Sequence, residues 1–125
     1  MASLSIRVDL SASRALGPGK IRLLELIEKT GSISAAGRAM KMSYRRAWLL
    51  LDELNNSFRE PVATTMLGGR SGGGATLTRF GKRLVKGYRR MESDAEKAVS
   101  DYLAMVDEAR VAKRAGTSPA RKAAK

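Results

Sequence analysis

Apolar residues alternate with polar ones near the start of the chain and recur at helical spacing over much of the remainder. In residues 4–10 the apolar period is two, which predicts a strand with one buried face. A single strand is not stable by itself, so this one needs a partner elsewhere in the chain. A Gly-Pro-Gly segment at residues 17–19 then leads into an apolar stripe that predicts a helix over residues 20–29, ended by Thr30 and Gly31.

Residues 31–58 (GSISAAGRAMKMSYRRAWLLLDELNNSF) predict two helices joined by a tight turn. Ser32 or Ser34 can cap the first helix, which ends near Met40, because a serine oxygen accepts an unpaired amide hydrogen at a helix start. Ser43 can cap the second helix, over residues 43–57. One face of that helix is apolar, with Ala47, Leu50 or Leu51, Leu54 and Phe58. Its start is basic and aromatic, as a helix that reads the major groove requires, with Tyr44, Arg45, Arg46 and Trp48.

A hairpin is predicted after this helix pair. Pro61 blocks helix continuation, and the Val and Thr content of residues 62–67 indicates a strand. The segment GGRSGGG, whose one charge is Arg70, separates that strand from a second extended run at residues 75–77, which favours a wing. A phosphate-binding loop would need Gly-Lys-Ser/Thr leading into a helix, and no lysine follows until Lys82, so nucleotide binding is not expected.

Thr78 can cap a last helix that runs from about Arg79 to Ala112. Its apolar residues follow alternating steps of four and three, which makes an uninterrupted heptad seam of Leu84, Tyr88, Met91, Ala95, Ala98, Tyr102, Met105 and Ala109. Near its start the seam can pack on the chain's own core. Beyond Met91 it extends past a compact domain, so self-association is favoured there, and the whole seam is the predicted dimerisation surface.

Charge bears on the partner. The chain has 24 Lys and Arg against 12 Asp and Glu, a net charge of +12, which favours a polyanion: nucleic acid first, an anionic membrane surface second. The basic segments lack the apolar moment and aromatic anchors of interfacial helices, so a membrane partner is not expected. Residues 113–125 carry five basic and no acidic residues without apolar periodicity, which predicts a disordered tail.

Several classes of function are excluded or disfavoured by composition. Without cysteine or histidine the chain has no disulfides, no thiolate zinc site and no histidine-dependent triad. Its carboxylates lie mainly on predicted helices as solvated charges and do not assemble a general acid-base pair, so the chain is not expected to be an enzyme. No apolar run approaches the ~20 residues of a membrane span and no signal peptide is recognisable, which predicts a cytoplasmic, nucleoid-associated protein.

The order strand, helix, helix-turn-helix, wing and long helix now matches a family. Residues 31–47, Trp48, Asn55, the wing GGRSGGGATLT and Phe80-Gly81 strongly resemble the N-terminal DNA-binding domain of the molybdate-responsive ModE regulators, and more distantly the winged helix of LysR-type regulators. The resemblance implies a mainly α fold with a small β component. It divides the chain into a winged helix-turn-helix over residues 1–82, a long dimerisation helix over residues 83–112 and the tail over residues 113–125.

What the resemblance implies for function is a homodimeric, sequence-specific transcriptional regulator that reads an inverted repeat in double-stranded DNA. The predicted DNA contacts, from the recognition helix, the preceding helix and the wing, are Ser32, Ser34, Ser43, Tyr44, Arg45, Arg46, Trp48 and Arg70. Full-length members of the family carry C-terminal modules that bind molybdate. This chain shows no counterpart, so it resembles a single-domain member without a cofactor, and a separate sensor protein is a candidate partner.

Three alternatives stay open at this level. Arg45 and Arg46 can donate paired hydrogen bonds to guanine or hold phosphates, or they can form an ordinary solvated face. Trp48 can pack against the domain or contact the groove. The whole protein can be a non-specific or architectural binder in which charge and tail matter more than base readout.

Overall fold

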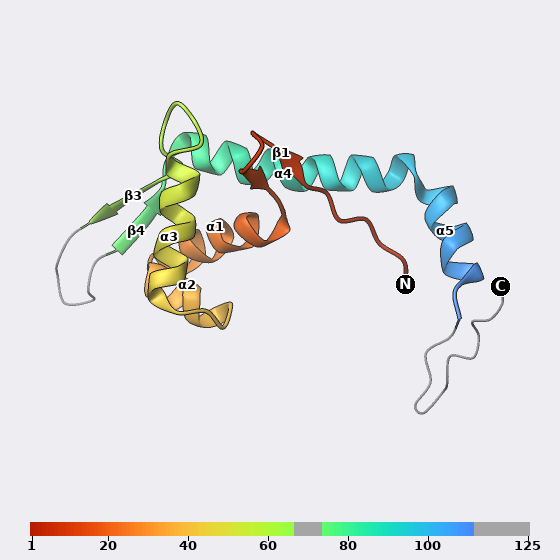
Figure 1. Ribbon diagram of the computed structural model, residues 1–125, viewed down its shortest axis with the longest axis horizontal. Helices are drawn as coiled ribbons and strands as arrows, with labels where there is room; N and C mark the ends of the chain where they lie inside the picture. Colours follow the sequence, from red (N-terminus) through yellow and green to blue (C-terminus); the bar gives the residue numbers. More distant parts are fainter. Residues whose placement is uncertain (67–73, 112–125) are drawn as a thin grey trace.

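Helix α1 (Pro18–Thr30) lies at the centre of the computed structural model, which describes residues 1–66 and 74–111 (Figure 1). Proline suits the first turn of a helix, where its missing amide hydrogen is not needed. At the other end Gly31 adopts a left-handed conformation (φ 71°) and its amide donates to the Ile27 carbonyl oxygen at 2.7 Å. The predicted helix and its end are thus confirmed. Five of its residues are buried: Ile21, Leu23, Leu24, Leu26 and Ile27.

Helix α2 (Ile33–Ala39) follows at once. The Ser32 hydroxyl accepts a hydrogen bond from the Ala35 amide at 3.0 Å, which makes Ser32 the capping residue. Gly37 allows α2 to approach the next helix closely, since a β-carbon there would lie 3.2 Å from the Ala47 β-carbon. The turn after α2 contains Lys41 at φ 58°, the one non-glycine residue with a positive φ within residues 1–66 and 74–111.

Helix α3 (Tyr44–Asn55) begins as predicted, because the Ser43 hydroxyl accepts from the Arg46 amide at 3.1 Å. It ends two residues before the expected position 57. Beyond it the side chain of Asn55 fastens the next segment: its Oδ1 accepts from the amides of Val62 and Ala63 at 2.7 and 3.2 Å. One amide side chain therefore fixes the start of the hairpin relative to α3.

The wing consists of β3 (Ala63–Met66) and β4 (Gly74–Leu77), paired antiparallel with Ala63 opposite Leu77. The Ala75 amide donates to the Gly31 carbonyl oxygen at 3.0 Å, so β4 is also tied to the end of α1. Both strands agree with the predicted hairpin. The tip, residues 67–73 with Arg70, lies outside the described residues.

The strand predicted over residues 4–10 is much shorter. Only β1 (Val8–Asp9) pairs, antiparallel to β2 (Ala15–Leu16), a partner strand that the apolar pattern did not indicate. The ladder cannot lengthen because α1 starts two residues after β2. Burial alternates as predicted through Val8, whereas Leu10 is exposed at the turn, where its amide donates to the Arg14 carbonyl oxygen at 2.8 Å.

The single long helix predicted from residue 79 to residue 112 is wrong. The structure has two helices, α4 (Arg79–Ala98) and α5 (Ser100–Ala109), and Figure 1 shows α5 turned sharply away from the axis of α4. Val99 lies between them at φ −112° and ψ 20°. A β-branched residue is a weaker helix former, and Asp101 suits the first turn of a new helix. The heptad seam is therefore bent between Ala98 and Tyr102.

The first turns of α4 belong to the core. Thr78 caps the helix, its hydroxyl accepting from the Gly81 amide at 2.9 Å and donating to the Pro61 carbonyl oxygen at 2.8 Å. Val85 and Tyr88 are buried. With α1, α2, α3 and the wing, α4 completes a mainly α fold with a small β component, arranged as in a winged helix-turn-helix. Among the described helices, none combines the length and the apolar character needed to cross a membrane.

Candidate nucleic-acid interface

The rotation of α3 is set by its buried side. Ala47, Leu51 and Leu54 are at most 2 % exposed and pack in the core. The sequence left open whether Leu50 or Leu51 belongs to the apolar face. The structure buries Leu51 in the core, while Leu50 is half-buried beside it. Phe58, beyond the end of the helix, is half-buried with its ring centroid 5.3 Å from that of Phe80. With this face committed to the core, the opposite face of α3 is turned to solvent.

The outward face carries the predicted basic and aromatic side chains. Arg45 and Arg46 are exposed, and Tyr44 is 52 % exposed at the first position of the helix. Within residues 1–66 and 74–111 neither arginine forms an ion pair, although seven other positive groups do. Among the described residues no carboxylate therefore pairs with their guanidinium groups, which can bind acceptors on another molecule.

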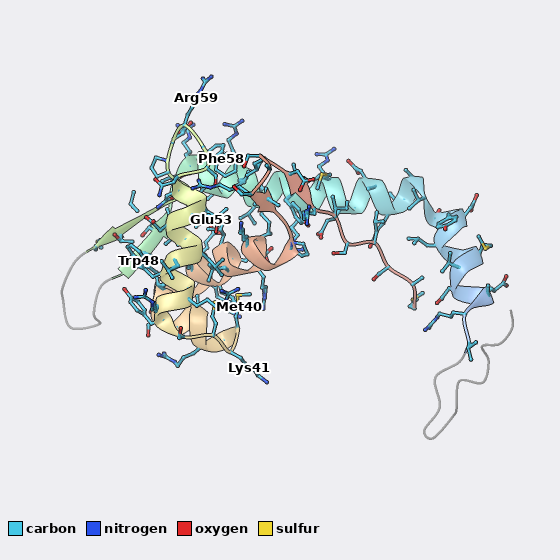
Figure 2. The ribbon with its side chains drawn as sticks, viewed as in Figure 1. Met40, Lys41, Trp48, Glu53, Phe58 and Arg59 are labelled. Atoms are coloured by element: carbon cyan, nitrogen blue, oxygen red, sulfur yellow. The ribbon has the colours of Figure 1, made fainter. Side chains whose placement is uncertain are left out.

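Trp48 packs in part against the domain, while a groove contact stays a prediction. It is 42 % exposed, and it also lines a pocket of about 110 Å³ with Leu51, Asp52, Asn55 and Thr65 at the junction of α3 and β3. In Figure 2 its side chain extends from α3 on the side of the hairpin. One part of the indole packs at that junction and the rest remains at the surface.

The two serines of α2 differ. The Ser32 hydroxyl is used in capping, whereas the Ser34 hydroxyl accepts from Arg38 Nη1 at 3.1 Å. Both residues are half-buried near the start of the helix. Arg38, which is exposed, was missed by the sequence reasoning. Its position four residues after Ser34 was the available signal, because side chains at that spacing meet on a helix.

Leu49 was also missed. It is 46 % exposed on the outward face of α3, one turn beyond Arg45. Within the run of three leucines, residues 49–51, apolar spacing alone did not show which one faces solvent. Lys41, also missed, is exposed in the turn that leads into α3; Figure 2 shows its side chain pointing away from the body of the protein.

Two ionic contacts hold the helices behind this face. Lys20 of α1 donates to Glu53 of α3 at 3.2 Å. On the far side of α1, Glu25 accepts two hydrogen bonds from Arg89 of α4, both 2.9 Å, and Arg89 also donates to Glu92 at 2.8 Å. The hydrogen bonds that Arg89 donates to Glu25 lower the pKa of Glu25, and the same bonds, with the one to Glu92, raise the pKa of Arg89. These contacts fix α3 and α4 on α1.

The predicted dimerisation residues divide at Met91. Tyr88 is buried and its hydroxyl donates to the Ile6 carbonyl oxygen at 2.6 Å, so it packs within its own chain. Leu84 and Met91 are half-buried along a groove of about 290 Å³ that Val8 also lines. Farther out, on α5, Tyr102 and Met105 are 63 % and 52 % exposed. Of the three alanines of the seam, Ala95 is half-buried, whereas Ala98 and Ala109 are exposed.

The chain is homologous to part of several longer bacterial proteins. It is 40 % identical over 99 residues to the molybdenum transport protein ModE of Azotobacter vinelandii, which covers 79 % of this chain and 36 % of that protein. It is 40 % identical over 87 residues to the molybdenum-pterin-binding protein MopB of Rhodobacter capsulatus, covering 70 % of this chain and 32 % of the relative. It is 33 % identical over 97 residues to the DNA-binding transcriptional dual regulator ModE of Escherichia coli, covering 78 % and 37 %.

These similarities support a relationship to the ModE family of transcriptional regulators, and the names of these relatives are those of regulators or molybdenum-related proteins rather than enzymes. The chain spans about a third of the length of the curated relatives it matches. No family model matches it. Within the described ranges 1–66 and 74–111, no group of three or more Asp or Glu residues could hold a metal ion.

Proposed function

We propose that this chain is a sequence-specific DNA-binding regulator of the ModE type that acts as a homodimer on an inverted repeat. The observation that carries the proposal is the outward face of α3. Arg45 and Arg46 are exposed there without ion-pair partners in the described structure, on a helix whose other side is held in the core by Ala47, Leu51 and Leu54. A helix of this kind fits the major groove.

The way in which an arginine would recognise a DNA base follows from the geometry of its hydrogen-bond donors. A guanidinium group can donate two parallel hydrogen bonds to guanine O6 and N7, worth about 1–3 kcal/mol of discrimination against another base, or it can hold a phosphate. Arg45 and Leu49 share the most outward part of α3, whereas Arg46 lies nearer the side of half-buried Leu50. Arg45 is accordingly assigned to bases and Arg46 to the backbone. Ser32, Ser34, Ser43, Tyr44 and Trp48 flank them, and Arg70 is the predicted wing contact.

Self-association is assigned to the outer part of α4 and to α5. Exposed Tyr102 and Met105 lie there on an element that is described over its whole length and has no buried residue. A second copy would cover these side chains and the groove beside Leu84 and Met91. A two-fold dimer with its recognition helices about 34 Å apart would read an inverted repeat.

The first experiment selects bound sequences from random duplex DNA at about 150 mM salt, with and without molybdate. We expect an inverted repeat that is preferred about 10³-fold over random DNA. Molybdate is expected to change neither the sequence nor the affinity, because its site is assigned to modules beyond this chain. The alternative of a non-specific binder is favoured by the net charge of +12. It would be supported if the best repeat and random DNA bound equally, and that result would reject the regulator.

The second experiment tests the face of α3. Arg45→Ala is expected to lower affinity for the selected repeat by about 1–3 kcal/mol and to relax one position of the site. Arg46→Ala should weaken all sequences alike. The matched control is Arg59→Ala, an exposed arginine that Figure 2 shows at the opposite end of α3 from Lys41, and it should bind like the parent. Unchanged affinity in both α3 variants would reject the assignment of the recognition helix.

A further inference from the structure

Three large apolar side chains lie exposed on α3 beside its arginines. Tyr44, Trp48 and Leu49 are 52 %, 42 % and 46 % exposed. Among the described residues, nine large apolar side chains are more than a third exposed. Three of these nine lie within six consecutive positions of α3. Single exposed apolar residues are common on protein surfaces, but a cluster of this kind marks a contact surface.

The exposure of Leu49 does not result from poor packing. At 100° per residue it lies roughly 160° around the helix axis from both Ala47 and Leu51, which fill the core side. It shares the most outward line of the helix with Arg45, one turn before it. Whatever Arg45 contacts, Leu49 faces the same way.

A helix face that combines arginine with leucine and aromatic residues does not suit phosphates alone, because a leucine gains nothing from a phosphate. In the major groove the apolar feature of the base edges is the C5 methyl group of thymine, which apolar side chains contact directly. On the basis of the proposed function, we propose that Leu49, which shares the most outward line of α3 with Arg45, recognises thymine methyl groups. The DNA half-site is thus read by hydrogen bonds to Arg45 and by methyl contacts to Leu49.

The helix geometry places the two kinds of contact. Four residues of an α-helix span about 6 Å, and successive base pairs are about 3.4 Å apart. The thymine that Leu49 contacts lies within about two base pairs of the base that Arg45 contacts. The two contacts therefore belong to one half-site and can be examined on one short duplex.

The experiment uses the full chain and the repeat selected as described above, with each thymine of the half-site replaced in turn by uracil. Uracil keeps every hydrogen-bonding group of thymine and removes only the methyl group. For the parent protein, uracil at the contacted position should lower affinity about fourfold, because the contribution of burying one methyl group is lost. In Leu49→Ala that loss should disappear, since the leucine that covered the methyl group is gone. Leu10→Ala, the same change at an exposed leucine of the β1–β2 turn, should retain it.

Circular dichroism of Leu49→Ala should match that of the parent because the side chain is not in the core. Two results would overturn the inference while leaving the proposed function intact: uracil without effect at every position in a protein that still prefers the repeat, or a uracil penalty that is equal in Leu49→Ala and the parent. Equal binding of the repeat and random DNA by the parent would instead reject the proposed function itself, so the two failures are distinguishable.

Discussion

The body of the protein and its outer arm differ in charge and in the burial of their apolar side chains. The body, residues 1–91, carries 17 Lys and Arg against 6 Asp and Glu, and it contains every buried apolar residue of the described structure. The arm, the end of α4 with α5, reverses the charge: residues 92–111 hold 6 acidic and 2 basic residues, and α5 buries no side chain. The body is stabilised from within and has an electropositive surface. The arm has exposed apolar side chains and no core of its own.

This difference assigns the two proposed partners to different parts of the chain. A polyanion is attracted to the body and repelled by the arm, whereas exposed Tyr102 and Met105 favour a second copy at the arm. The N-terminal segment contacts the arm. The amide of Ala2 donates to the Asp107 carboxylate at 2.9 Å. That hydrogen bond and one from Arg110 lower the pKa of this carboxyl group.

The largest expected effect is at the contact where α4 enters the body. A β-carbon at Gly81 would overlap the carbonyl oxygen of Val62, which belongs to backbone fixed by Asn55. Gly81→Ala should therefore lower the free energy of unfolding by about 2–4 kcal/mol, measured by urea denaturation. The matched control is Gly87→Ala on the same helix, where the described structure leaves open space; it should stabilise by about 0.5–1 kcal/mol. Equal stability of the two variants would contradict this packing.

The next prediction tests whether self-association depends on the arm rather than on the body. In the double variant Tyr102→Glu with Met105→Glu, two exposed apolar groups become charged on an already acidic arm. The dimer dissociation constant, measured by sedimentation, should rise at least about 100-fold because a central apolar contact is lost. The unfolding free energy of the isolated chain should change by less than about 0.5 kcal/mol. Undiminished dimer would place the interface on the body instead.

A smaller effect concerns the acid sensitivity of the body. Arg89 lowers the pKa of Glu25, so the folded state releases this proton more readily than the unfolded chain. The resulting stability is present above pH 4.5, the ordinary pKa, and is lost as the pH falls through the lower pKa of the folded state. Glu25→Gln should cost about 1 kcal/mol at pH 7, since both groups are partly exposed, and the gap to the parent should close as the pH falls below the lowered pKa of Glu25. A gap that persists in acid would show that packing, rather than charge, is lost.

How much of this was predictable differs along the chain. The caps at Ser43 and Thr78 followed from sequence because a cap bonds to an amide only three residues away. The break at Val99 did not, since heptad spacing continues through it and no proline or glycine marks it. Its bend is accompanied by a contact 105 residues apart in sequence, between Ala2 and Asp107, which no local pattern contains.

The exposed face of α3 was predicted in part for the same reason. Arg45 and Arg46 were identified because the helix start is a local signal. Leu49 was missed because the choice among three successive leucines depends on how α3 is rotated against the core, through residues far away in sequence. Lys41 differs, because its positive φ belongs to the local end of α2: its amide donates to the Arg38 carbonyl oxygen at 3.0 Å and the Met42 amide donates to that of Gly37 at 2.9 Å.

The smallest expected effect is at Lys41. A lysine at φ 58° costs roughly 1 kcal/mol relative to glycine because its β-carbon crowds the following carbonyl group. Lys41→Gly should remove that strain, but glycine also gains entropy in the unfolded chain, so a net gain of no more than about 0.5 kcal/mol is expected by thermal denaturation. Lys41→Ala, which keeps the strained backbone and removes the charge, is the matched control and should show no gain. If DNA affinity falls equally in both variants while their stabilities differ, the Lys41 side chain contributes a phosphate contact to the body's electropositive surface. If affinity is unchanged in both, the positive φ of Lys41 serves only the local end of α2.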